Sequence, residues 1–261
     1  MKKWIFVLGL FLSFNVYCDE ITIIDQTDPN DATTKCGDNC TWTLYSDGTL
    51  EIKGTGEMYE WNGIADTSYG HDYASNAPWD KYYNSVQKVD ISGILSIGAY
   101  SFRHFRLLSE INISDDVLTI GYGAFNHVPA LSELKLPDNL TTISDAAFAW
   151  NNQSLSLTIP DSVTNLCSTA FIHTSLTNLY CSSAQKQMCL EALKEAGYSD
   201  ERIENVLKLY QKQNGQYFYN GKFYKNSSDV GSLSWIKKRI YSIDEANLVT
   251  GEKNRISIKY K

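Results

Sequence analysis

The chain has 261 residues, with 23 Lys and Arg against 30 Asp and Glu, so its formal net charge is −7 at pH 7. Residues 19–182 hold 7 basic and 21 acidic side chains, whereas residues 183–261 hold 14 basic and 9 acidic ones. The acidic body argues against nucleic acid as a partner, because nucleic acids select basic surfaces. The opposite charge of the two parts indicates either a different partner for each part or simple solvation.

The chain begins MKKWIFVLGLFLSFNVYC, in which two lysines precede an apolar run of about a dozen residues. This pattern predicts a secretory signal peptide over residues 1–18, cleaved near Cys18, and the run is too short for a good membrane span. We found no later stretch apolar enough to cross a bilayer. We therefore expect an extracytoplasmic protein, secreted, at the cell surface or periplasmic, and the short lysine-led signal favours a bacterial source.

Five cysteines remain after the predicted cleavage, and an oxidising compartment favours their pairing. Cys36 and Cys40 are close enough in sequence to close a tight loop. Which two of Cys167, Cys181 and Cys189 pair cannot be read from spacing, and one thiol stays unpaired. A zinc site is disfavoured because the chain has no paired C-x-x-C motif.

Residues 19–85 predict a β-rich N-terminal cap. Strands are expected at Trp42–Leu44 and Thr49–Ile52, joined by a turn at residues 46–48. The physical task of such a cap is to cover an open sheet edge. The segment is rich in aromatic residues, namely Tyr59, Trp61, Tyr69, Tyr73, Trp79, Tyr82 and Tyr83. Packing of the cap explains them best, and a sugar-stacking surface is the alternative.

Residues 86–182 carry an internal repeat with a period of 23 residues. It is clearest in four phenylalanines: Phe102, Phe125, Phe148 and Phe171. Further apolar columns share the spacing: Ile97, Ile120, Ile143 and Leu166, then Ile111, Leu134 and Leu157, then Ile113, Leu136 and Ile159. A fixed period over several apolar columns is typical of a stacked solenoid, in which neighbouring coils bury one continuous core. The alanines before the phenylalanines indicate that the rings are part of this core.

Each unit opens with an apolar–polar–apolar triplet such as Leu134-Lys135-Leu136, which predicts a short strand. Pro137 or Pro160 then ends the strand. This pattern of strand, proline, isoleucine and Ala-Phe resembles the BspA-like leucine-rich repeats, the 23-residue Treponema pallidum type, and the N-terminal segment resembles their leader module. The resemblance implies an α+β fold, a curved solenoid of about four repeats with a parallel sheet on its concave side.

In a solenoid the concave sheet is the usual binding face. Side chains between the buried columns point to that face, and we call them the polar strip. Its members are Lys88, Asp90, Glu110, Asn112, Glu133, Lys135, Ser156 and Thr158. We predict that this strip contacts a protein ligand, with plain solvation of a sheet face as the alternative.

After the repeats, residues 183–212 predict a helical hairpin cap. The first helix covers residues 184–196 and ends at Gly197, and the second begins at Ser199 and carries apolar positions to Tyr210. Residues 213–261 predict a small basic α+β module, with a type I′ hairpin at Asn220-Gly221. Its basic residues are Lys237, Lys238, Arg239, Lys253, Arg255, Lys259 and Lys261. They could attach the protein to an anionic envelope or glycan, or simply be solvated.

We found no catalytic or phosphate-binding motif, so the sequence predicts a protein that is not an enzyme and has no cofactor. His104, His127 and His173 share one repeat column, in which Trp150 takes the fourth place. Two histidines in adjacent coils could share a metal ion, but that column offers no carboxylate, so we predict no metal site.

The resemblance to BspA-like repeats implies protein–protein interaction, with adhesion to host or envelope proteins. The alternative is a carbohydrate- or envelope-binding structural protein that uses the N-terminal aromatic residues and the basic C-terminal residues. In either case no membrane span is expected after signal cleavage.

Overall fold

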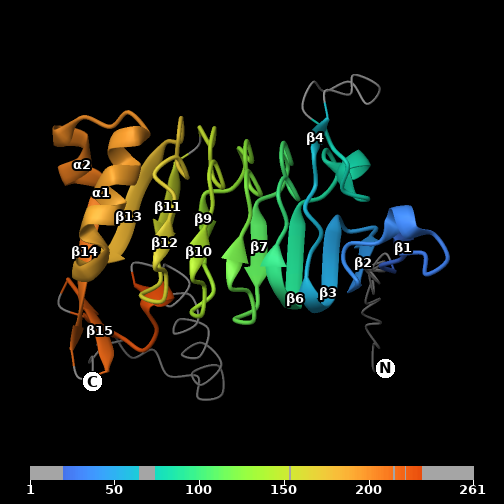
Figure 1. Ribbon diagram of the computed structural model, residues 1–261, viewed down its shortest axis with the longest axis horizontal. Helices are drawn as coiled ribbons and strands as arrows, with labels where there is room; N and C mark the ends of the chain where they lie inside the picture. Colours follow the sequence, from blue (N-terminus) through green and yellow to red (C-terminus); the bar gives the residue numbers. More distant parts are fainter. Residues whose placement is uncertain (1–19, 65–73, 153, 214, 221, 231–261) are drawn as a thin grey trace, which may run out of the picture.

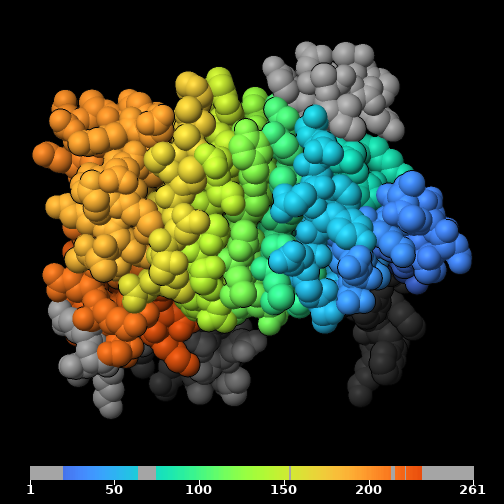
Figure 2. Space-filling model, viewed as in Figure 1, coloured from blue at the N-terminus to red at the C-terminus, as the bar shows by residue number. Residues whose placement is uncertain are grey.

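The computed structural model describes residues 20–64, 74–152, 154–213, 215–220 and 222–230 (Figure 1). The predicted signal peptide, the basic residues beyond position 230, Tyr69 and Tyr73 lie outside this part of the chain. The described residues form an elongated stack of coils. Successive segments lie side by side as bands from the N-terminal to the C-terminal end (Figure 2).

The N-terminal segment forms a β-rich layer, as the sequence predicts. Its strands are β1 (Ile23–Gln26), β2 (Asn39–Tyr45), β3 (Thr49–Glu57), β4 (Gly63–Ile64) and β5 (Ala74–Ser75). Strands β2 and β3 form the predicted antiparallel hairpin, and Gly48 in its turn has a φ of 82°. A disulfide joins Cys36 to Cys40, which confirms the predicted pair.

The repeats alternate between two parallel ladders. The first ladder has two hydrogen-bonded parts in line. Strand β6 (Lys88–Ile97) pairs with β7 (Glu110–Ile113), and β9 (Glu133–Leu134), β11 (Leu155–Thr158) and β13 (Leu176–Ser182) pair with one another. The second ladder contains the end of β6, then β8 (Thr119–Ile120), β10 (Thr142–Ile143) and β12 (Asn165–Leu166). Strand β3 pairs in parallel with β6, so the cap continues the first ladder.

Between the ladders the phenylalanine column forms a stack of buried rings. All four rings are fully buried, and neighbouring centroids lie 5.4 to 5.9 Å apart. Trp79 of the cap stacks on Phe102 at 6.0 Å, so the column continues into the N-terminal segment. The prediction that these phenylalanines are core residues is confirmed, and their burial contributes to holding the coils in register.

At the C-terminal end, helices α1 (Lys186–Glu195) and α2 (Asp200–Val206) pack on the last repeat (Figure 1). The second helix is shorter than predicted. The chain leaves it for strand β14 (Leu207–Gln213), which pairs in parallel with β13, so Tyr210 is a strand residue. The apolar side chains of Leu207 and Leu209 are compatible with either a helix or a strand. The edge of β13 offers backbone hydrogen-bond partners, and pairing with it selects the strand.

An antiparallel hairpin, β15 (Gln216–Tyr219) and β16 (Lys222–Tyr224), extends this sheet. Asn220 in its turn has a φ of 46°, as a type I′ turn requires. Short 3₁₀ helices lie at Ala32–Thr34, Asp80–Tyr82, Ser183–Gln185 and Ser227–Asp229. In the part of the chain that the structure describes, no helix has the length and apolar character to span a membrane.

Candidate functional site

The polar strip lies along the first ladder, and its N-terminal half is a connected network of side chains. The Lys88 ammonium lies 3.4 Å from a carboxylate oxygen of Asp90 and 3.3 Å from one of Glu110. The Asn112 amide donates hydrogen bonds to the same two carboxylates, at 2.7 and 3.2 Å. Register explains the contacts, because Lys88 is opposite Glu110 and Asp90 is opposite Asn112.

This network extends onto strand β3 of the cap. Glu51 is opposite Asp90 in the parallel pairing of β3 with β6. Its carboxylate contacts the Lys53 ammonium at 2.6 Å and accepts a hydrogen bond from the Tyr45 hydroxyl at 3.3 Å. The repeat pattern places no residue of the cap on the binding face. The signal that could have done so is the alternation along residues 49–53, which places Glu51 and Lys53 on the same face as the strip.

The C-terminal half of the polar strip is covered in part by the chain itself. The Thr158 hydroxyl donates to the Val230 carbonyl at 2.6 Å and is buried. Lys135 pairs with Asp229 at 3.1 Å. The Ser228 hydroxyl donates to Asp138 at 2.7 Å, beside these contacts. Residues 227–230 therefore lie against β11, and the open part of the strip is at β3, β6 and β7.

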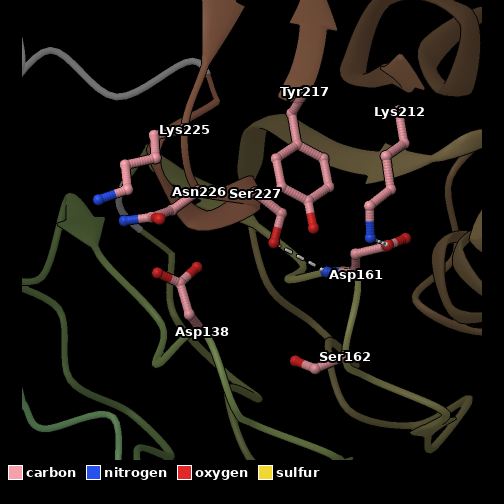
Figure 3. A pocket seen from close by; sticks show the side chains of 8 residues that line it. All are labelled: Asp138, Asp161, Ser162, Lys212, Tyr217, Lys225, Asn226 and Ser227. Atoms are coloured by element: carbon pink, nitrogen blue, oxygen red, sulfur yellow. Dashed lines mark hydrogen bonds and ion pairs between the residues drawn. The ribbon is translucent and has the colours of Figure 1, made fainter. Parts of the chain in front are cut away.

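A hollow of about 300 Å³ lies where the C-terminal hairpin meets the turns that follow the first-ladder strands. Its lining residues are Asp138, Asp161, Ser162, Lys212, Tyr217, Lys225, Asn226 and Ser227 (Figure 3). Lys212 pairs with Asp161 at 3.3 Å, and the Asp161 backbone N–H donates to the Ser227 hydroxyl at 3.0 Å. The walls mix carboxylates with lysines, unlike the mostly apolar lining of a typical small-molecule site.

The tryptophans of the cap are interior, as the packing interpretation expects. The exposed fractions of Trp42, Trp61 and Trp79 are 2, 8 and 0%, and their rings pack edge to face. Tyr59 is 39% exposed, and its hydroxyl donates to Asp38 at 2.7 Å. This hydrogen bond raises the pKa of Tyr59 above its usual value. The tryptophans of the cap hold its core together and present little surface to a sugar.

The histidine column lies on the edge loops that follow the phenylalanines. The rings of His104 and His127 stack with 4.3 Å between centroids. Burial lowers the pKa of His127, and the positive charges of Arg106 and Arg103 add to that effect. Among the described residues, no group of three or more His, Cys, Asp and Glu side chains could hold a metal ion.

Comparison with known proteins rests on the repeats. A family model described as BspA type leucine rich repeat region matches residues 81–196 in six copies. This part of the chain belongs to that repeat family. The matched region begins before and ends after the range 86–182 expected from the 23-residue period, and its six copies exceed the expected four or so. No curated protein matches the chain.

The solved structures that resemble this chain are described as leucine-rich repeat proteins. One from Eubacterium ventriosum is 22% identical, with 73% of this chain and 47% of that one covered and a TM-score of 0.49. One from Bacteroides ovatus is 21% identical, with 50 and 31% covered and a TM-score of 0.41. The T. pallidum protein is 18% identical, with 53 and 67% covered and a TM-score of 0.38. The chain thus spans about half, or less, of the first two.

Proposed function

We propose that this chain is an extracytoplasmic repeat protein that binds another protein through the open part of the polar strip, on β3, β6 and β7. The observation that carries the proposal is the connected network of Lys88, Asp90, Glu110 and Asn112 on a sheet face of a BspA-type repeat region. Stacked repeats of this kind serve as scaffolds for extended binding surfaces. The proposed role is binding, with adhesion at a cell surface as its setting, and it involves no catalysis.

The network is suited to recognition because its side chains hold one another in place. Ordering long charged side chains on binding costs free energy, and a preformed network has already met much of that cost. The open strip contains the carboxylates of Glu51, Asp90 and Glu110 against the ammonium groups of Lys53 and Lys88. This slight excess of acid favours a partner that presents Lys or Arg, and such pairing steers association and weakens as salt rises.

The extracytoplasmic setting is supported by two features of the chain. The first is the lysine-led apolar segment at residues 1–18, which predicts secretion. The second is the Cys36–Cys40 disulfide, since such bonds persist in oxidising compartments. Protease shaving of intact source cells, followed by mass spectrometry, tests the location. We expect peptides of residues 86–182 without lysis, and their release only after lysis would rule out adhesion.

Site-specific photo-crosslinking tests the binding face. A photoreactive residue at Asn112 in the open strip should give a protein adduct on intact cells. The same residue at Thr142, on the second ladder, is the matched control. A second pair of variants compares Glu110→Lys with Asp116→Lys, which changes the net charge equally at an exposed turn position. With the photoreactive residue at Asn112, we expect Glu110→Lys to lose the adduct and Asp116→Lys to keep it. Equal adducts from both probe positions and from both charge variants would contradict the proposal.

The tryptophans of the cap are interior, so they do not support the alternative of a carbohydrate-binding protein. The basic residues that it also uses lie outside the described residues. The open polar strip therefore remains the surface that best supports a function.

A further inference from the structure

The loop edge of the repeats differs in charge from the rest of the acidic body. Residues 101–109, 124–132, 147–155 and 170–175, which follow the second-ladder strands, contain no Asp or Glu. Residues 19–182 as a whole hold 21 acids. Among the described residues, all three arginines lie along this edge, Arg103 and Arg106 at its N-terminal end and Arg202 at its C-terminal end.

The backbone ladder of the edge loops holds these residues in line. The His127 N–H donates to the Ala149 carbonyl at 2.9 Å, and the Trp150 N–H donates to the Ile172 carbonyl at 3.0 Å. Arg202 on α2 reaches the same line, because its guanidinium donates to the Ser175 hydroxyl at 3.3 Å. The edge is therefore one continuous surface, which we call the basic ridge. Its members are Arg103, Arg106, His127, Trp150, His173 and Arg202.

Exposed flat rings lie between the two ends of the basic ridge. Trp150 is 47% exposed and stacks against His173, with 4.1 Å between ring centroids. Nearby, Arg106 lines a hollow of about 420 Å³ together with Pro129, Ala130, Ser132 and Ser154. Among the described tryptophans, Trp150 is the exposed one, because those of the cap are buried. Its ring offers an apolar face beside polar and cationic groups.

We propose that the basic ridge binds an acidic polysaccharide, with the Trp150 ring against a sugar face and the arginines against sugar carboxylates. Arginine suits this role because its planar fork pairs with a carboxylate through two hydrogen bonds. The exposed ring favours a sugar over an acidic peptide, since an aspartate-rich peptide has no flat apolar face to cover it. The ridge is separate from the polar strip and uses neither the cap tryptophans nor the basic residues beyond position 230.

The test measures binding of polygalacturonate to the whole protein by calorimetry, with dextran as the neutral sugar and poly-aspartate as the acidic peptide. We expect binding of polygalacturonate alone, weakening as salt rises. Trp150→Ala and Arg106→Gln should each weaken it about tenfold, which corresponds to about 1.4 kcal/mol. Lys186→Gln, on helix α1 and off the ridge, is the matched control and should leave it unchanged.

Because Trp150 and Arg106 are exposed, both variants should keep the wild-type circular dichroism spectrum and melting temperature. Absence of polygalacturonate binding overturns the proposal. Equal binding of poly-aspartate that is insensitive to Trp150→Ala also overturns it, and identifies an acidic peptide as the partner. These results are independent of the photo-crosslinking test, which probes a different face.

A second inference concerns two buried thiols. Cys181 ends the last repeat strand β13, Cys189 lies on helix α1, and both are fully buried. Helix α1 packs on β13, and the Cys181 thiol raises the pKa of Cys189, so the two thiols lie close together. Cys167 is separate, half-exposed on the second ladder side, with its thiol 2.9 Å from an Asp145 carboxylate oxygen. The structure therefore separates the three C-terminal cysteines into an adjacent pair and a single thiol.

We propose that Cys181 and Cys189 form a disulfide that fastens helix α1 to the last repeat. The step breaks two S–H bonds and forms one S–S bond, and two electrons and two protons pass to a small disulfide such as oxidised glutathione, which becomes two thiols. The Cys181 thiol and burial raise the pKa of Cys189. The thiolate is the form that reacts, and few thiolates form once these cysteines are buried. We therefore expect the disulfide to form during folding, before helix α1 packs on β13.

Refolding of the reduced protein with oxidised glutathione, then alkylation in denaturant and peptide mass mapping, tests this pairing. We expect a linked pair of peptides containing Cys181 and Cys189, with Cys167 alkylated. Cys189→Ala should abolish the linked pair, while Cys167→Ser should leave it intact. Alkylation of all three cysteines after refolding would overturn the inference. Because the experiment uses purified protein, its result does not depend on where the protein resides in the cell.

Discussion

The side-chain oxygen of Asn151 accepts a hydrogen bond from the Val128 N–H, one repeat earlier, at 2.6 Å. The amide nitrogen of Asn151 donates to two carbonyls, that of Phe125 at 2.9 Å and that of Phe148 at 2.8 Å. The side chain is 1% exposed. One buried amide thus satisfies three backbone groups from two consecutive coils at the loop edge, where neither ladder reaches them.

Replacing this amide should be costly. Asn151→Ala leaves the Val128 N–H and the Phe125 carbonyl buried without a partner, and each such group costs about 1–3 kcal/mol. The Phe148 carbonyl keeps its hydrogen bond from the Thr174 hydroxyl. We expect the free energy of unfolding to fall by at least about 2 kcal/mol, measured by urea denaturation. The neighbouring Asn152→Ala is the matched control, since Asn152 is exposed and its loss should cost under about 0.5 kcal/mol. Equal losses in the two variants would contradict this account.

Left-handed backbone recurs in the repeats at the same register. Tyr100, Gly123 and Ala146 are 23 residues apart and have φ values of 56°, 57° and 51°. Of the three, only Gly123 is a glycine, the residue that adopts a positive φ without strain. The structure therefore identifies Ala146 as a strained position that the repeat pattern alone does not reveal.

Ala146→Gly should relieve that strain. A left-handed residue other than glycine costs about 1–2 kcal/mol, and the gain is reduced by the greater freedom of glycine in the unfolded chain. We expect a net increase of about 0.5–1 kcal/mol in the free energy of unfolding. Ala147→Gly is the control, because Ala147 is fully buried without a positive φ and should be destabilised by the same change. A decrease in both variants would refute the strain argument.

The sequence predicts contacts between equivalent positions of neighbouring repeats better than contacts between segments far apart in the chain. The 23-residue period identifies the buried phenylalanines because each ring meets its equivalent in the next coil. It misses strand β14, since residues 203–210 fit both helical and alternating spacing and only the open edge of β13 selects the strand. The repeat pattern does not predict that residues 227–230 lie on the polar strip, because Thr158 and Val230 are 72 residues apart in the sequence.

The carboxylate of Asp145 links stability to pH. Hydrogen bonds from Cys167 and then Thr169 lower the pKa of Asp145 below its ordinary value of 3.8. A carboxylate whose pKa is lower in the folded state stabilises the fold above the unfolded pKa, and this contribution is lost as pH falls through the folded pKa. Asp145→Asn should therefore be less stable than wild type at pH 7, and the difference should shrink below about pH 4.

Thermal melts of both proteins between about pH 7 and pH 2.5 measure this difference. Thr169→Val is the companion variant, because it removes one of the two donors and should give a smaller loss with the same pH dependence. A gap between wild type and Asp145→Asn that stays constant over the whole range would show that the carboxylate's charge has no part in it.

The hydroxyl of Thr158 should control how firmly residues 227–230 lie on the polar strip. Thr158→Val removes the donor to the Val230 carbonyl while keeping the shape of the side chain, at a cost of about 1 kcal/mol. We expect the amides of Ser228 and Val230 to exchange with deuterium about fivefold faster, while the ladder amides of β11 keep their rates. Thr142→Val on the second ladder, the control, should leave both sets unchanged. If the two variants exchange alike, Thr158 does not hold this cover, and the closed half of the strip needs another explanation.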